Sequence, residues 1–401
     1  MARFEAFRGT SYVPGNAVAD DVIAPPYDVV DAAQRARLAS LSPYNAIHVE
    51  LPEPAAGLDR YESAAALFER WHAESAVAVA REPAFYVYRM TFRDEAGSLR
   101  STTGVLGALY LDPTQSGQVL PHEETTPKDK SDRLSLLRAS RTNFSPIWGL
   151  STASGLAGIC SEAVATTVGG GDVWRATDED GVVHETWCIT DSAAVAAITG
   201  RVASEPVLLA DGHHRYETAC AYLAERPEST GTAAVLALVV ELVEDQLSVR
   251  AIHRLLSGVD PVALPAQLTA YFTVEPGPED PAQLQASMSS AGALGLVTRE
   301  ATWLLTPTEE LLAAAGDDLD SSRLAYALHA LGVDDVRYQH GLANVVEAVR
   351  SGEAAAAVLL RPVSVAQIAN TAHGGRRMPP KSTFFHPKPR TGMVFRELDP
   401  A

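Results

Sequence analysis

A short apolar run turns abruptly polar in the segment Val207-Leu208-Leu209-Ala210-Asp211-Gly212-His213-His214-Arg215-Tyr216. The first four residues predict a buried strand, Asp211-Gly212 predicts a tight turn, and residues 216–223 resume a helical pattern. Strand, turn and helix in this order are a building unit of α/β proteins. We therefore expect an α/β fold of mixed α+β character, with this junction at its centre.

The same junction is the strongest candidate for a functional site. Backbone N–H groups at a helix N-terminus favour an anion, and Arg215 can make a forked contact with a phosphate group. Either His213 or His214 can donate a hydrogen bond or move a proton near neutral pH. In the alternative interpretation, Asp211 only caps the helix and one histidine is buried and hydrogen-bonded to the backbone. Several consecutive polar or flexible residues between two apolar segments favour the functional interpretation.

Length and composition indicate a globular chain with two lobes. The chain has 401 residues, of which 46% are hydrophobic, and no apolar run reaches the roughly 18 residues that cross a bilayer. The cysteines Cys160, Cys188 and Cys220 are too widely spaced for a zinc motif or a disulfide framework. The first eight residues carry charge where a signal peptide is apolar, so we expect a cytoplasmic protein.

The net charge narrows the class of partner. Lys and Arg total 32 against 50 Asp and Glu, which gives a formal charge of −18 and repels the phosphate backbones of nucleic acids. We expect a small-molecule substrate and a nucleotide as partners, no nucleic acid and no membrane, and we leave a homo-oligomer open. Anion binding then requires local cations, which gather in residues 128–141 and 376–390; the second stretch holds Arg376, Arg377, Lys381, Lys388 and Arg390.

A second polar cluster follows Pro121 and supplies acid, base and cation within a dozen residues. Its members are His122, Glu123, Glu124, Lys128, Lys130, Asp132 and Arg133. Such groups serve proton-coupled phosphate chemistry, and Glu123 and Glu124 can hold Mg²⁺ through water. A solvated loop that leads into a helix, with Asp132 paired to nearby cations, explains the cluster equally well. His122-Glu123-Glu124 lacks the second histidine of a HExxH zinc motif.

Two proline-containing turns near the N-terminus deliver further polar groups. Residues 23–29 present Tyr27 and Asp28, and residues 42–45 present Asn45. Taken alone, both are turns of fixed geometry with capping polar groups. The sequence contains no GxGxxG, GxxxxGK[ST] or GxSxG pattern, so the usual signatures of Rossmann, P-loop and α/β-hydrolase sites are missing.

The remaining chain alternates strand and helix patterns. Residues 84–92 and 104–111 predict a hairpin, and residues 59–81 predict an amphipathic helix that packs on it. Residues 232–244 predict a buried strand with residues 247–256 as its partner, and residues 261–350 predict alternating helices and strands. We expect one lobe over 1–255, a second over 256–370, and a proline-rich ordered segment over 371–401 that returns to the site.

Taken together, the motifs resemble those of the bacterial and archaeal family catalogued as domain of unknown function 1015. The matching segments are Ala24-Pro25-Pro26-Tyr27-Asp28-Val29, Pro43-Tyr44-Asn45, Pro121-His122-Glu123 with Lys128 and Asp132-Arg133-Leu134, Asp211-Gly212-His213-His214-Arg215-Tyr216, and Met378-Pro379-Pro380-Lys381-Ser382-Thr383. They occur in order over nearly the whole chain. The family name implies no settled activity.

The strand-Asp-Gly-His-His-Arg-helix unit also resembles the phosphate-binding motif of the ParB/sulfiredoxin superfamily, which includes free-serine kinases. This resemblance implies a ParB/sulfiredoxin-like core with large α/β insertions, and it implies that Gly212, His214 and Arg215 cradle nucleotide phosphates. The catalytic cysteine of sulfiredoxins would fall at His213, so sulfinic-acid reductase chemistry is not expected. The acidic charge argues against a DNA partition protein.

From residues and resemblance together we predict a small-molecule phosphotransferase that uses ATP or ADP with Mg²⁺, with a free hydroxy amino acid such as serine as acceptor by analogy. A phosphohydrolase and a non-catalytic nucleotide or metabolite sensor remain open alternatives. The predicted catalytic residues are Glu123, His122, His213 and Asp211, with Glu123 and Glu124 as metal ligands. The predicted cofactor-binding residues are Gly212, His214, Arg215, Lys381, Arg133 and Lys128. The predicted substrate-binding residues are Tyr27, Asp28, Asn45, Tyr216, Ser382 and Thr383.

Overall fold

The computed structural model describes residues 1–94, 97–121, 127–167, 173–374, 378–379 and 381–399. The chain forms two compact units, unit 1 with Met1–Ser248 and Pro387–Ala401, and unit 2 with Val249–His386. The chain passes from unit 1 to unit 2 after Ser248 and back to unit 1 after His386. The lobe boundaries expected from the sequence lie after residues 255 and 370.

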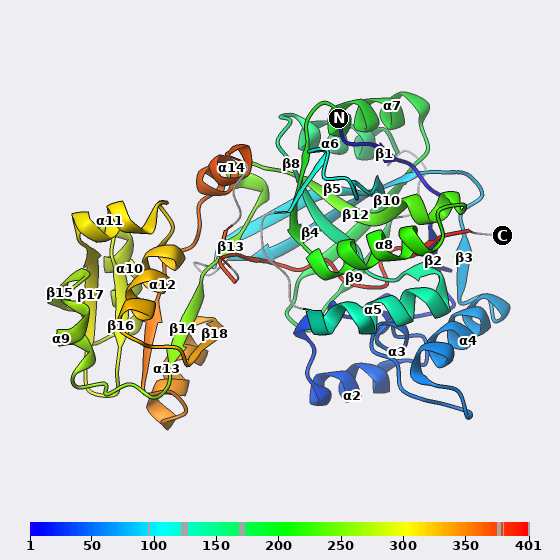
Figure 1. Ribbon diagram of the computed structural model, residues 1–401. Helices are drawn as coiled ribbons and strands as arrows, with labels where there is room; N and C mark the ends of the chain where they lie inside the picture. The colour runs from blue at the N-terminus through cyan, green and yellow to red at the C-terminus, as the bar shows by residue number, and fades with distance from the viewer. Residues whose placement is uncertain (95–96, 122–126, 168–172, 375–377, 380, 400–401) are drawn as a thin grey trace. The chain divides into compact units, whose positions relative to one another are not determined.

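Unit 1 is a mixed α/β structure on a nine-stranded sheet (Figure 1). The strand order is β6-β11-β8-β12-β5-β4-β10-β9, and β1 pairs with β5. The strands are β1 (Phe4–Glu5), β4 (Phe85–Arg93), β5 (Leu99–Tyr110), β6 (Val119–Pro121), β8 (Ile147–Ser151), β9 (Trp174–Thr177), β10 (Val183–Ile189), β11 (Val207–Asp211) and β12 (Ala234–Glu241). The pairs β6/β11 and β8/β12 are parallel and the other pairs are antiparallel. The predicted hairpin is confirmed as β4 and β5.

Two helices pack on this sheet through apolar side chains. Cys160 of α6 (Leu156–Thr167) and Ile198 of α7 (Ser192–Ala203) share one buried cluster with Val105 and Val235 of the central strands. Next to it, α5 (Pro127–Ser140) and α8 (His213–Glu225) pack against each other, as Figure 1 shows. The predicted strand-turn-helix junction lies where β11 ends at Asp211 and α8 begins at His213.

A second core of unit 1 forms around N-terminal helices. They are α1 (Ala19–Val22), the 3-10 helix η1 (Tyr27–Val29), α2 (Ala32–Leu41), α3 (Ile47–Glu50) and α4 (Arg60–Ala73). The predicted helix over 59–81 is correct at its start, where Asp59 and Glu62 form a capping box. It is wrong at its end, because Val77–Val79 is the β-branched strand β3, paired with β2 (Thr10–Tyr12).

The predicted packing of this helix on the hairpin is also wrong. Its buried Ala64, Phe68 and Trp71 belong to the cluster with α3 and Phe395, and the described members of that cluster include no residue of β4 or β5.

The predicted pairing of 247–256 with the 232–244 strand is wrong for a different reason. Both edges of β12 are occupied, by β5 and by β8.

Unit 2 is a second mixed α/β structure, as the alternating pattern of 261–350 predicts. Its six-stranded antiparallel sheet has the order β15-β17-β16-β19-β14-β18. The strands are β14 (Ile252–Leu256), β15 (Phe272–Pro276), β16 (Leu294–Val297), β17 (Thr302–Pro307), β18 (Val336–His340) and β19 (Ala356–Leu359). The helices are α9 (Leu264–Leu268), α10 (Pro281–Ala291), α11 (Glu309–Ala315), α12 (Asp320–Ala330), α13 (Leu342–Ser351) and α14 (Val365–His373). The short strands β13 (Val249–Arg250) and β20 (Phe384–Phe385) pair with each other.

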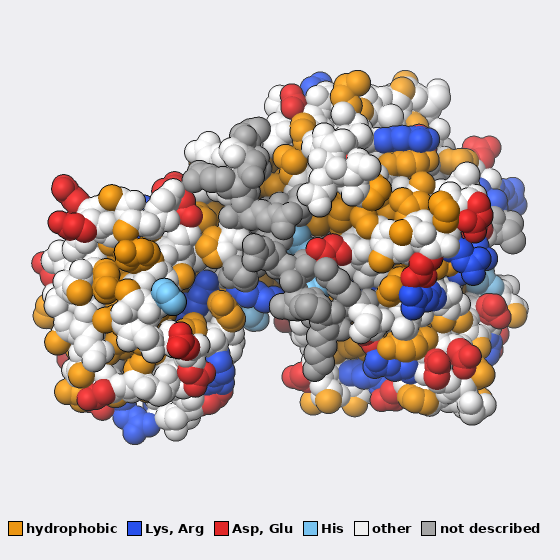
Figure 2. Space-filling view, viewed as in Figure 1, with side chains coloured by type: hydrophobic (Ala, Val, Ile, Leu, Met, Phe, Trp, Pro, Cys, Tyr) orange, Lys and Arg blue, Asp and Glu red, His pale blue; other side chains and the backbone are white. Residues whose placement is uncertain are grey.

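Acidic and basic side chains are interspersed on the faces seen in Figure 2. Within the described residues, every helix is too short or too polar to cross a membrane.

Candidate functional site in unit 1

The predicted strand-turn-helix junction is present, with Asp211 at the end of β11 and His213 at the start of α8. Between them Gly212 adopts the left-handed conformation, with φ +86°. A Cβ there would lie 3.0 Å from a methyl carbon of Ile147 and 3.1 Å from the Arg215 guanidinium. Glycine is the residue that tolerates both constraints. Because Gly212 is the N-cap residue, Asp211 is not the cap, and the positive end of the α8 dipole lies at this turn.

Lys388 connects this junction with the N-terminal motif. Its ammonium donates to Asp211 Oδ1 at 2.9 Å and to Asp28 Oδ2 at 3.0 Å. Burial alone would lower the pKa of Lys388, but the charges of Asp211 and Asp28 outweigh it and raise the pKa above its ordinary value. Lys388 is therefore a charged group held between two carboxylates, which are themselves partly exposed.

Arg215 lies on the other side of Asp211. Its guanidinium donates to the Pro146 carbonyl oxygen at 2.5 Å and to Asp211 Oδ2 at 3.2 Å. Burial works against its charge, yet Asp211 and Asp28 keep its pKa raised. The junction thus gathers two cations, Arg215 and Lys388, and two carboxylates, Asp28 and Asp211.

Tyr27 and Arg133 form a layer beside this cluster. The Arg133 guanidinium carbon lies 4.3 Å from the centre of the Tyr27 ring, and burial raises the pKa of Tyr27 to about 12. Arg133 also donates to the Glu50 carbonyl oxygen at 2.9 Å and to Asp132 at 2.8 Å. The Arg133 side chain is 6% exposed, and its described contacts are with Tyr27, Asp132 and Glu50.

The segment that carries Lys388 is anchored by a buried polar network. Arg390 donates from Nε to Asp178 Oδ2 at 2.7 Å and from its backbone N–H to the Tyr88 hydroxyl at 3.1 Å. His184 joins the two acceptors, since its Nδ1 lies 2.7 Å from the Tyr88 oxygen and its Nε2 lies 2.9 Å from Asp178. Burial would raise the pKa of Asp178, but the His184 hydrogen bond and the Arg390 charge hold it well below its ordinary value.

Backbone pairing completes this anchor. The N–H groups of Ala24 and Thr391 each donate to the other residue's carbonyl oxygen, at 3.0 and 2.8 Å. This pairing brings residues 24–28 alongside residues 388–391, which explains how Asp28 reaches Lys388.

Two predicted substrate-binding residues, Asn45 and Tyr216, make hydrogen bonds within unit 1. Asn45 is fully buried, and its amide donates to the carbonyl oxygens of Asp21 and Ile23 and accepts from the Ile47 N–H. Tyr216 is buried as well, and its hydroxyl accepts from the Asp112 N–H at 2.8 Å. Tyr216 also forms a side-chain hydrogen bond with Cys220, so both side chains are held by contacts within unit 1.

The remaining predicted residues lie at the start of α8, in unit 2 or outside the described residues. His213 is buried and His214 is partly buried in the first turn of α8. Lys381, Ser382 and Thr383 belong to unit 2, where the Ser382 hydroxyl is 2.9 Å from that of Ser321. Three candidates of the second cluster, His122, Glu123 and Glu124, lie outside the described residues, and Lys128 lies in α5 with its side chain outside the described part.

Sequence reasoning missed Lys388, Arg390 and Glu50 as parts of this arrangement. A signal existed for the first two, because both belong to the basic stretch 376–390. Their carboxylate partners lie up to 360 positions away in the sequence, which no local pattern reveals. Glu50 carried no signal, since a single acid at the end of a short helix is common.

No group of three or more His, Cys, Asp and Glu side chains able to hold a metal is found within the described residues. The site there offers two carboxylates, Asp28 and Asp211, beside two cations.

Three solved structures resemble the chain at low sequence identity. A free serine kinase in complex with AMP has 12% identity and a TM-score of 0.38, with 69% of this chain and 86% of that chain covered. SbnI with a C-terminal truncation, from Staphylococcus aureus, has 14% identity and a TM-score of 0.40, with 72% and 86% covered. A conserved hypothetical protein from Pyrococcus furiosus has 12% identity and a TM-score of 0.39, with 73% and 95% covered.

No curated protein matches the sequence significantly. The family profile of a protein of unknown function, DUF1015, matches residues 4–327. The chain therefore belongs to the DUF1015 family.

Proposed function

We propose that the site at the start of α8 binds the phosphates of a nucleotide and transfers a phosphoryl group to a small-molecule acceptor. The observation that carries this proposal is the position of Lys388. Its ammonium pairs with Asp28 and Asp211, which come from two distant segments of the chain, next to the N-terminus of α8. A helix N-terminus with adjacent cations is a phosphate-binding arrangement, and positioning with charge stabilisation is the main catalytic resource in phosphoryl transfer.

Each group of the cluster has a distinct role in this proposal. The first N–H groups of α8, Arg215 and Lys388 bind phosphate oxygens. Asp28 and Asp211 balance these cations before phosphate binds, and they then become free to accept a proton from the acceptor hydroxyl or to hold a cation.

Magnesium fits the chemistry of these donors. Mg²⁺ in nucleotide sites is commonly bound by one or two carboxylates together with substrate phosphates, and the site offers two carboxylates. Asp28 and Asp211 would hold the ion, with Glu123 and Glu124 as the further ligands that the sequence predicts. When bound, Mg²⁺ would offset the charge of the transferred group.

The acceptor that we propose is a free hydroxy amino acid such as serine, by the superfamily analogy alone. Calorimetric titration of the full chain with ATP and ADP, with and without Mg²⁺, tests the nucleotide site. Phosphate-transfer assays on nucleotides that bind, with serine, threonine and water as acceptors, then separate a kinase from a phosphohydrolase. Binding without any transfer would indicate a sensor, and the nucleotide proposal fails if the wild type binds neither nucleotide in the presence of Mg²⁺.

Arg215→Ala is expected to weaken ADP binding by about 10-fold to 100-fold. A hydrogen bond to a charged group contributes about 1.5–3 kcal/mol, and each 1.4 kcal/mol is a factor of ten. The same titration measures the change. Arg138→Ala is the matched control, because Arg138 of α5 pairs with Glu225 at the far end of α8 and is half exposed. Equal losses in both variants would show that Arg215 does not contact the nucleotide.

Glu123→Gln is expected to leave nucleotide binding largely intact and to abolish transfer. The substitution preserves the shape of the side chain while removing its charge and its basic oxygen. Single-turnover transfer with saturating nucleotide measures the effect. Normal turnover would remove Glu123 from the predicted catalytic residues without affecting the proposed nucleotide site.

A further inference from the structure

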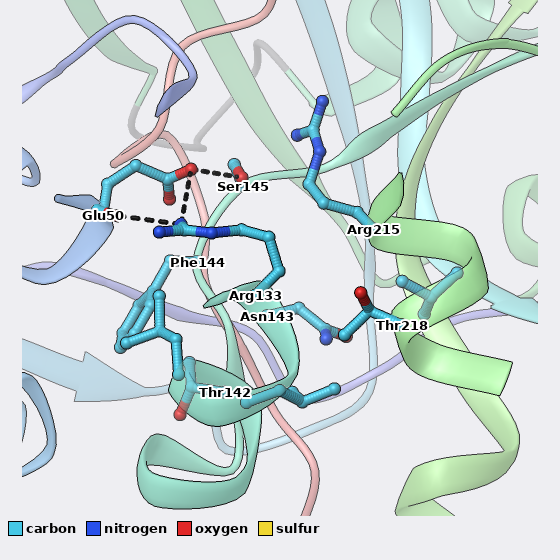
Figure 3. A pocket seen from close by; sticks show the side chains of 11 residues that line it. Glu50, Arg133, Thr142, Asn143, Phe144, Ser145, Arg215 and Thr218 are labelled. Atoms are coloured by element: carbon cyan, nitrogen blue, oxygen red, sulfur yellow. Dashed lines mark hydrogen bonds and ion pairs between the residues drawn. The ribbon is translucent and has the colours of Figure 1, made fainter. Parts of the chain in front are cut away.

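A small cavity lies next to Arg215 inside unit 1, between α5, the short strand β7 (Thr142–Asn143) and α8. About 50 Å³ of it is accessible to water. Figure 3 shows Glu50, Arg133 and Ser145 on one side of this cavity and Thr218 on α8 on the other. Charged and hydroxyl groups thus line a small, partly open cavity.

Two buried polar atoms at this cavity have no hydrogen-bond partner among the described residues. They are Nε of Arg215 and Oγ1 of Thr218. Thr218 is 3% exposed and lies three positions after Arg215, so both side chains lie on the same face of α8. A buried donor without a partner costs about 1–3 kcal/mol, so native proteins rarely keep two of them side by side.

We propose that this cavity is an ordered-water site, and that its water accepts a hydrogen bond from Arg215 Nε and bridges it to Thr218 Oγ1. The volume supports water as the ligand. One water molecule needs about 10–15 Å³ of such space, whereas small-molecule sites measure about 300–1,000 Å³. The cavity therefore holds a few water molecules and is too small for a nucleotide or an amino acid.

The charges around the cavity also favour water over an anion. The two guanidinium groups that line it, those of Arg133 and Arg215, already face carboxylates. Asp132 accepts from Arg133, and Asp211 accepts from Arg215. Glu50 adds a further negative charge on the cavity wall, where its Oε1 accepts from the Ser145 hydroxyl at 2.9 Å. A neutral ligand that both donates and accepts hydrogen bonds matches this lining.

The water gives Thr218 a positioning role. The other two nitrogens of the Arg215 guanidinium are held by Pro146 and Asp211. A water-bridged Nε fixes the plane of the whole group, and with it the direction in which Arg215 faces the site. This second step rests on the proposed phosphate-binding role of Arg215, whereas the water site itself does not.

The test compares Thr218→Val with Thr218→Ser in the full chain. Valine keeps the shape of threonine but removes the hydroxyl, whereas serine keeps the hydroxyl. If water bridges Thr218 to Arg215, Thr218→Val lowers the thermal midpoint by about 2 °C or more, and Thr218→Ser lowers it less. Thr218→Val also weakens ADP binding severalfold, and Thr218→Ser restores it. A crystal structure of the wild type should show the water within 3.5 Å of both atoms.

Thr391→Val is the matched control. The Thr391 hydroxyl is also buried without a partner among the described residues, but it lies outside this cavity. Its removal is expected to leave the midpoint unchanged or to raise it. An unchanged or raised midpoint for Thr218→Val, or an equal fall in both variants, would overturn the water site. A fall in midpoint with unaltered ADP affinity would overturn the positioning role. If the wild type binds no ADP, the proposed function fails, while the midpoints still decide the water site.

Discussion

Lys388→Met is expected to reduce ADP affinity by about 10-fold to 100-fold, because it removes the cation that lies between Asp28 and Asp211. Asp28 and Asp211 would then keep only Arg215 as a nearby cation, and their repulsion would oppose the incoming phosphates. The substitution also destabilises unit 1, by about 1–2 kcal/mol rather than the larger cost of a fully buried pair, because both carboxylates are partly exposed. Calorimetric titration and chemical unfolding measure the two effects.

Lys381→Met is the control for this prediction. Lys381 is the lysine predicted from the sequence to bind the cofactor, whereas Lys388 is the lysine that pairs with Asp211 in the structure. Loss of affinity in Lys388→Met with little change in Lys381→Met would assign the role to Lys388. The reverse result would return it to Lys381, and equal affinity in all three proteins would contradict a lysine contact with the nucleotide.

Asp178→Asn is expected to lower the free energy of unfolding of unit 1 by about 3 kcal/mol. The Asp178 carboxylate is 4% exposed and accepts hydrogen bonds from Arg390 and His184. Its neutral replacement leaves a buried guanidinium poorly compensated. Since Arg390 lies two residues after Lys388, the variant should also weaken ADP binding. Asp180→Asn is the control, because Asp180 lies 3.2 Å from Arg390 but is 66% exposed, and it should change stability little.

The pH dependence of this network has a defined sign. The pKa of Asp178 is lowered in the folded state, so its contribution is present above the unfolded pKa of about 3.9 and is lost as pH falls toward the lower folded value. Burial lowers the pKa of His184, so stability also declines as pH falls below about 6.5, where the unfolded chain takes up a proton first. Unfolding measured from pH 7 to pH 3 should show the difference between wild type and Asp178→Asn shrinking below about pH 4. A difference independent of pH would contradict an ionised Asp178.

Features that depend on neighbouring residues were predictable from the sequence. The apolar run, the glycine and the helical pattern after it identify the junction of β11 and α8, because strand burial, left-handed backbone and helix periodicity are each local properties. The β4/β5 hairpin followed from two strand patterns separated by a polar turn. Alternating patterns likewise predicted the mixed helices and strands of unit 2.

Features that depend on which segments meet were decided by the tertiary structure. The sequence indicated strands at 232–244 and 247–256 but not their partners, because any free strand edge offers the same backbone hydrogen bonds. The helical pattern predicted from the sequence runs to residue 81, whereas α4 ends at Ala73, Ser75 is left-handed with φ +57°, and Val77–Val79 pairs with Thr10–Tyr12.

The charges of the site show the same division. The sequence by itself determined that Asp28, Asp211, Arg215 and a basic C-terminal stretch were candidates, since charge and motif are properties of residue type. The tertiary structure decided that Lys388 meets Asp28 and Asp211, and that Arg133 turns inward to Tyr27. An ion pair between residues 177 or 360 positions apart depends on how the sheet and the C-terminal segment bring their backbones together, and that arrangement leaves no trace in the residues next to either charge.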